Sequence, residues 1–403
     1  MPPSLTTARH RGAWPFAAAT FALAALLIGT NLPTPLYPTY ERVFSFAPLG
    51  VTLIFATYAI VLIPSLLIFG PLSDVVGRRR VLLPAVLVAA LASALFAVAD
   101  GVAWLFAARA VQGIALGAVQ GTATAALVDT EPGGRHKRAA LVGSIATAAG
   151  GAAGPLLGGL LAEYAPAPRV LPYLVEIGLL LVAFVGLARF LPPTASTGKR
   201  WRPERPSVPA AIRGTFAVAS VVAFLAWAVT ALFMALMPSY LAQLTQTQNL
   251  LLAGGIVALM LGCSAAAQTA LPKLGSTRAQ TGGLILLIAG LGGIIAAAQT
   301  SSVTVVFVAT VLAGVGQGMA FAGSLADTNA VAPHHRRADV LSSFYVVMYA
   351  GVALPVIGIG FLAIPLGLIH AVEIFSIGTG VACVLALVLL RVTRQRRHPL
   401  VDG

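Results

Sequence analysis

The stretch Gly70-Pro71-Leu72-Ser73-Asp74-Val75-Val76-Gly77-Arg78-Arg79-Arg80 is a polar break between two long apolar runs, residues 49–70 and 80–98. Its glycines permit a tight turn and the close approach of neighbouring helices. Its acid stands close to a row of arginines, and carboxylate–guanidinium pairs form strong, directional hydrogen bonds. These residues therefore predict two helices that meet at a short loop held together by an ion-paired network.

Apolar runs of this kind make up most of the chain. Of its 403 residues, 58% are hydrophobic and 9% are charged, whereas soluble domains carry about 25% charged residues. A membrane-spanning helix needs about 20 mostly apolar residues. Such runs occur at residues 14–37, 49–70, 80–98, 102–127, 138–162, 170–191, 214–241, 247–271, 280–300, 302–326, 339–362 and 366–391. The chain is therefore predicted to be an all-α membrane protein with twelve transmembrane helices, the first of them a retained span and not a cleaved signal peptide.

The twelve runs form two sets of six that repeat each other. Short motifs of the first set recur in the second after about 200 residues. The recurring pairs are Pro38-Thr39-Tyr40 with Pro238-Ser239-Tyr240, Asp129-Thr130 with Asp327-Thr328, and Val175-Glu176-Ile177 with Val372-Glu373-Ile374. Such a repeat predicts two pseudo-symmetric six-helix bundles that rock around a central site.

The segment between the two sets contains five prolines and a cluster of cations, which is typical of a flexible linker. With the N-terminus inside, 22 of the 25 Lys and Arg side chains lie on the cytoplasmic side, as the positive-inside rule requires. We therefore expect a multi-pass protein of the cell membrane with both termini cytoplasmic. The expected parts are a cytoplasmic N-terminus (1–13), an N-terminal bundle (14–191), a linker (192–213), a C-terminal bundle (214–391) and a cytoplasmic tail (392–403).

Several classes of protein are disfavoured by what the sequence contains. The net charge of +13 follows from membrane topology and does not indicate a nucleic acid partner. Cys263 and Cys383 lie in apolar runs, so neither a disulfide framework nor a metal site is expected. No hydrolase motif, HExxH motif or Walker loop occurs, so we expect neither an enzyme nor an ATP-driven pump. A proton gradient is then the available driving force, with no cofactor, and we expect a monomer.

Residues 70–80 resemble the loop signature G-x-L-x-D-[RK]-x-G-R-[RK] of the major facilitator superfamily. With the twelve spans and the repeat, this resemblance covers the whole chain. It implies a conformational lock formed by Gly70, Asp74, Gly77, Arg78 and Asp129. In this lock, Asp74 packs against the start of the eleventh span and Arg78 meets Asp129 at the inner end of the fourth.

The fifth span carries a second resemblance, to the G-x-x-x-G-P-x-x-G-G motif of the drug:proton antiporter (multidrug efflux) branch of that family. The residues that match it are Gly150, Gly154, Pro155, Gly158 and Gly159. Small residues let such a helix pack closely against its neighbours. The resemblance implies export of small amphipathic molecules in exchange for protons. The alternative is a proton-coupled symporter or facilitator that takes up a small metabolite.

The fourth span carries Arg109-Ala110-Val111-Gln112-Gly113, which resembles the family's R-x-x-Q-G motif. On a helical wheel Arg109, Gln112 and Gln120 fall within an arc of about 80 degrees, so this face meets protein or water. Other spans present polar or polarisable side chains where the family lines its substrate cavity. The candidates for the cavity are Gln112 and Gln120 of the fourth span together with Asn31, Trp227, Thr230, Met234, Gln317 and Ser324. Such a lining suits a neutral, amphipathic or weakly anionic substrate, although each residue is equally consistent with helix packing.

Two acids, Glu176 and Glu373, lie at equivalent depths in the sixth and twelfth spans. A carboxylate in hydrocarbon needs a partner or a proton. We expect Glu176 to pair with Arg109 and to serve the fold. The candidates for proton coupling are Arg109, Glu176, Glu373 and His370. Of these we expect Glu373, with His370 one turn away, to carry the proton. The alternative is that both acids are protonated and structural.

Overall fold

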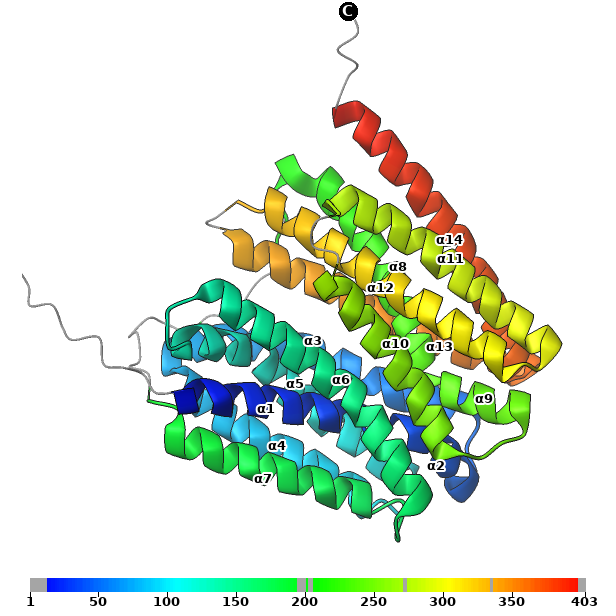
Figure 1. Ribbon diagram of the computed structural model, residues 1–403, viewed down its shortest axis with the longest axis horizontal. Coiled ribbons are helices and arrows are strands. Elements are labelled where there is room, and N and C mark those ends of the chain that lie inside the picture. The colour runs from blue at the N-terminus through cyan, green and yellow to red at the C-terminus, as the bar shows by residue number, and fades with distance from the viewer. Residues whose placement is uncertain (1–12, 194–200, 202–205, 271–273, 334–335, 398–403) are drawn as a thin grey trace, which may run out of the picture.

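The chain forms two bundles of helices that lie side by side (Figure 1). The computed structural model describes residues 13–193, 201, 206–270, 274–333 and 336–397. The first bundle contains α1 (Ala13–Asn31), η1 (Thr34–Leu36), α2 (Tyr37–Phe44), α3 (Pro48–Val76), α4 (Arg78–Ala97), α5 (Val102–Thr130), α6 (His136–Tyr164) and α7 (Leu171–Phe190). The second contains η2 (Ala210–Ile212), α8 (Arg213–Ala235), α9 (Met237–Thr245), α10 (Leu250–Ala270), α11 (Ser276–Thr300), α12 (Val303–Val331), α13 (Arg337–Leu366) and α14 (Leu368–Arg397).

Twelve of these segments are long and apolar enough to cross a membrane. Large hydrophobic side chains face outward along α7 and α14, with Val185 and Leu385 each 64% exposed. Exposure of this kind is unfavourable in water and favourable against lipid chains. The predicted all-α membrane fold with twelve spans is therefore confirmed.

The first span is not the single continuous helix that its apolar run predicts. α1 ends at Asn31, a short 3-10 turn follows, and α2 continues the span to Phe44. Pro33 and Pro35 lie in the break, and proline can neither donate a backbone hydrogen bond nor fit inside a regular helix. The seventh span breaks at the equivalent place, between α8 and α9, just before Pro238. The two broken helices follow the sequence repeat.

The stretch 70–80 is also more helical than a loop. α3 continues through Asp74 to Val76 and α4 begins at Arg78, so Gly77 alone makes the turn. Its backbone angles, φ 101° and ψ 146°, lie in a region that side chains other than glycine's rarely allow. This one-residue turn places Asp74 and Arg78 close enough to pair.

The two bundles meet closely at the end that carries α2 and α9, which we call the α2–α9 end (Figure 1). The opposite end, where Gly77 joins α3 to α4, is called the Arg78 end. A large apolar core runs through both bundles, and a second lies between α1, α4, α5, α6 and α7. These cores leave few polar side chains inside the bundles, and those few define the candidate site.

Candidate functional site

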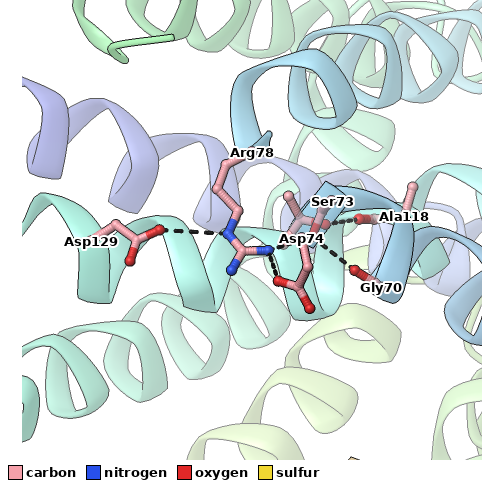
Figure 2. Close-up of polar contacts among 7 residues, drawn as sticks. Gly70, Ser73, Asp74, Arg78, Ala118 and Asp129 are labelled. Atoms are coloured by element: carbon pink, nitrogen blue, oxygen red, sulfur yellow. Dashed lines mark hydrogen bonds and ion pairs between the residues drawn. The ribbon is translucent and has the colours of Figure 1, made fainter. Parts of the chain in front are cut away.

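Arg78 lies between two acids from different helices at the Arg78 end (Figure 2). Its guanidinium pairs with Asp74 of α3, donates to Ser73 Oγ at 2.7 Å, and lies 3.5 Å from Asp129 Oδ2 of α5. The Asp74 and Asp129 side chains are 65% and 51% exposed, whereas that of Arg78 is 19% exposed. The structure thus brings together the Asp, Arg and Asp of the predicted lock. The expected packing of Asp74 against the start of α13 stays a prediction.

A fourth charged group beside this network was missed in the sequence. Glu131 follows α5 directly, and one of its carboxylate oxygens accepts the backbone N–H groups of Gly133 and Arg135, each at 2.7 Å. The other oxygen accepts from Arg138 at 3.1 Å. These hydrogen bonds hold the pKa of Glu131 below its ordinary value, and the bond from the Arg135 backbone makes the largest contribution. The turn Glu131-Pro132-Gly133-Gly134 was the available signal for this role.

Glu131→Gln is expected to destabilise the protein at neutral pH and to have no effect in acid. A carboxyl whose pKa is lowered by folding stabilises the fold above its unfolded pKa, and that contribution is lost as the pH falls through the lower folded value. The difference in thermal midpoint between wild type and variant in detergent should therefore begin to shrink as the pH falls below about 4.3, the ordinary pKa of a glutamate, and should vanish below the lower folded pKa. Asp100→Asn, at an exposed turn, is the control, and an equal difference at every pH would contradict the expectation.

Arg109 is fully enclosed in the first bundle and is 1% exposed. It donates to Tyr37 Oη, to the Thr30 carbonyl at 2.9 Å and to Gln112 Oε1 at 2.5 Å. Four aromatic rings surround the guanidinium with centroids 5.5–5.9 Å away, those of Tyr37, Phe55, Tyr58 and Phe96. Such rings stabilise a desolvated cation.

The helix break in the first span explains why Arg109 and Gln112 have these partners. The carbonyl of Gly29 would accept from residue 33 in a continuous helix, but Pro33 has no N–H. Gln112 Nε2 donates to this carbonyl instead, at 2.9 Å, and Arg109 donates to the next one. A cation at a helix C-terminus also interacts favourably with the negative end of the helix dipole. The R-x-x-Q pair therefore caps the end of α1.

The expected ion pair between Glu176 and Arg109 is wrong. The Arg109 donors are taken by the α1 cap and Tyr37, and Glu176 is 0% exposed with no hydrogen-bond partner for either carboxylate oxygen among the described residues. Glu373, its counterpart in the repeat, is partly buried on α14, and His370 is exposed. The two acids therefore have different surroundings despite their equivalent sequence positions.

The surface between the bundles carries the aromatic part of the candidate cavity. Trp227 of α8 stacks edge-on against Phe321 of α12 and lies 6.4 Å from the ring of Tyr349 of α13. Tyr349 Oη donates to Gln120 Oε1 of the first bundle at 2.7 Å. Trp227 Nε1 is buried and has no partner among the described residues. The cluster therefore combines apolar ring faces with one hydrogen-bond donor that no described residue uses.

The other candidates for the cavity lie inside helix packing. Thr230 and Ser324 donate to carbonyls of their own helices, and Gln317 accepts from Ser264. Met234 belongs to the apolar core. Asn31, the last residue of α1, has an unpartnered Oδ1 among the described residues. Of the sequence candidates, Gln120 and Trp227 belong to the inter-bundle surface, where Phe321 and Tyr349 were missed.

The glycine-rich part of α6 packs against segments of both bundles. A side chain at Gly150 or Gly154 would collide with the backbone of α1 at Ala24 or Ile28, and one at Gly158 with the backbone of Leu32, just after α1. One at Gly159 would collide with Leu250 of α10. Glu163 Oε2, one turn further on, accepts the backbone N–H of Leu250 at 2.7 Å. α6 therefore joins the bundles at the α2–α9 end, beside a bond from Ser239 to Glu41.

Comparison with known proteins places this geometry among transporters. Residues 19–356 match the model of the Major Facilitator Superfamily. The Bacillibactin exporter of Bacillus subtilis (strain 168) is 33% identical over 34% of this chain. The Cephamycin export protein CmcT of Amycolatopsis lactamdurans is 30% identical over 47%, and the Puromycin resistance protein pur8 of Streptomyces alboniger is 33% identical over 46%. The matches span 36%, 38% and 36% of these relatives' own lengths.

Solved structures share the fold over nearly the whole chain. A bacterial homologue of the human lysosomal transporter Spinster, in an inward-facing and unoccupied conformation, has a TM-score of 0.77 at 16% identity, covering 96% of this chain and 98% of that one. The human organic anion transporter MFSD10 (TETRAN) has a TM-score of 0.69 at 18% identity, covering 94% and 99%. Likeness at these identities concerns the fold alone.

Proposed function

Because this chain belongs to the Major Facilitator Superfamily, and is a transporter rather than an enzyme, we propose that it exports small amphipathic molecules in exchange for protons by alternating access. The observation that carries the proposal is the packing of α6, which contacts α1 of its own bundle through Gly150 and Gly154 and α10 of the other bundle through Gly159. Such a seam allows two rigid bundles to separate and close again. The export and resistance names of three relatives support the outward direction.

The inter-bundle surface supports a neutral, amphipathic substrate. Trp227, Phe321 and Tyr349 offer apolar ring faces, while Gln120 and Trp227 Nε1 offer polar groups. No carboxylate or free cation lies in this cluster. Arg109, which would favour an anion, is enclosed as the cap of α1.

Accumulation of puromycin by inverted membrane vesicles tests the proposal. With an acidic interior, vesicles that hold this chain should take up puromycin, and a protonophore should abolish the uptake. Trp227→Ala should reduce uptake, whereas Trp14→Ala, at a lipid-facing position 67% exposed, should not. Bacillibactin and a cephamycin are the further probes. Accumulation by intact cells instead of inverted vesicles would support the alternative, a proton-coupled symporter or facilitator for uptake.

The orientation proposed for this exporter has both termini in the cytoplasm, which places the Arg78 end inside. In a chain whose own cysteines, Cys263 and Cys383, are replaced, Lys137→Cys should react with an impermeant maleimide only from the cytoplasm. Gln243→Cys, exposed near the end of α9, should react only from outside. The reverse pattern would overturn the orientation.

Asp74→Asn is expected to leave membrane insertion intact and to slow transport. The change removes the charge that pairs with Arg78, and a charge interaction at a helix end contributes about 0.3–2 kcal/mol. Since about 1.4 kcal/mol shifts a two-state equilibrium tenfold, the cytoplasmic side should open more often. Distances between spin labels across the Arg78 end, with Asp100→Asn as control, measure this shift. Unchanged distances together with wild-type transport would contradict it.

A further inference from the structure

Glu176 lies against an internal cavity that the sequence did not predict. The cavity has a volume of about 10 Å³ and lies between α1, α4, α5 and α7. Its lining is mostly apolar, but four of its residues carry polar side chains: Thr30, Ser93, Gln112 and Glu176 itself. That volume is room for about one water molecule, which needs two to four polar partners to be stable. The walls supply this number. A single buried water therefore fits beside the carboxyl group.

Gly29 of α1 shapes this site on two sides. A side chain at position 29 would collide with the Glu176 carboxyl, so only glycine leaves room for the acid. The carbonyl of Gly29 accepts from Gln112, which in turn accepts from Arg109. The acid, the cavity and the capped end of α1 thus form one connected unit, at the place where the first span breaks.

Among the residues that the structure describes, no cation pairs with Glu176. Arg109, the nearest cation in this network, donates its hydrogen bonds to Tyr37, Thr30 and Gln112. An ionised carboxylate without a donor or a cation is very costly in an apolar interior, whereas the neutral acid is not. The other ionisable groups on the helices packed against α7 are Arg78, Arg79 and Arg80 in the first turn of α4, His136, Lys137 and Arg138 in the first turn of α6, and Glu163 and Tyr164 at its end.

We propose that Glu176 and this cavity are the proton-binding site of the transporter. With its proton bound the acid is neutral, and the cavity beside it has room for one water. Release transfers its proton to that water, leaving a carboxylate and a hydronium ion, and requires the seam between α1 and α7 to open. The assignment rests on the proton coupling proposed above, and it moves the carrier role from Glu373 to Glu176.

Infrared spectroscopy of the purified protein tests this site directly. In detergent at neutral pH, where exposed carboxyl groups are ionised, the wild type should keep the carbonyl band of a protonated carboxylic acid, and titration to alkaline pH should remove it. Glu176→Gln should lack this band and Glu373→Gln should keep it. A wild type without such a band, or a band lost in Glu373→Gln and kept in Glu176→Gln, would overturn the assignment. The measurement requires neither a substrate nor knowledge of the direction of transport. Its outcome is therefore independent of the export test.

One further variant, Glu176→Asp, and a transport measurement keep the test decisive. Glutamine has the shape of the neutral acid, so Glu176→Gln should fold. If it fails to fold while Glu176→Asp succeeds, the charged form is the structural one and the proposal is wrong. In vesicles that accumulate puromycin, Glu176→Gln should lower the pH-driven accumulation about tenfold or more while exchange at equal pH continues. Unchanged pH-driven accumulation would also overturn the carrier role.

Discussion

Arg109→Met is expected to destabilise the transporter strongly. Methionine fills a similar volume and removes a buried charge, but it leaves the Thr30 carbonyl, Tyr37 Oη and Gln112 Oε1 without their donor. Each buried acceptor that loses its partner costs about 1–3 kcal/mol. The four ring contacts of the guanidinium are lost as well. Together these losses exceed the free energy gained by no longer burying a charged group, so little folded protein should be recovered.

The yield and thermal midpoint of the protein in detergent measure this effect. Arg169→Met is the matched control, because Arg169 lies over one ring, that of Phe44, at 5.7 Å and is only partly buried. The control should differ little from the wild type. If Arg109→Met is as stable as Arg169→Met, the capping role of Arg109 is wrong.

Gly254→Val should stop transport without preventing insertion. The Cα of Gly254 in α10 faces the carbonyl of Pro155 in α6, and a side chain there would collide with that backbone atom. No rotamer relieves such a clash, and overpacking typically costs about 1–3 kcal/mol. The collision arises only when the two bundles meet at the α2–α9 end. The variant should therefore populate conformations in which this end is open.

The next residue supplies the control. Gly255 lies on the same helix with open space around its Cα, so Gly255→Val should transport like the wild type. Puromycin flux and spin-label distances across the α2–α9 end distinguish the two variants. Equal flux through both would show that α6 and α10 do not close against each other during transport.

Much of the fold was predictable because membrane helices are defined locally. Twelve apolar runs predict twelve spans since each must satisfy its own backbone hydrogen bonds in lipid. The pairing of Asp74 with Arg78 follows from a spacing of four residues across one turn at Gly77. The break in the first span was not predicted, although Pro33 and Pro35 are visible in the sequence. The span was assigned from its apolar composition, which does not register a break in the helix.

The sequence by itself determined the spans, the repeat and the family, because composition, spacing and motif order carry them. The tertiary structure alone decided the partners of the buried polar groups. Gln112 takes the Gly29 carbonyl that Pro33 leaves without a donor, and Arg109 takes the next carbonyl, that of Thr30, so Glu176 is left beside a small cavity instead of a cation. Both outcomes depend on which atoms meet across helices far apart in the chain. Equivalent positions in the repeat, Glu176 and Glu373, therefore have unequal surroundings.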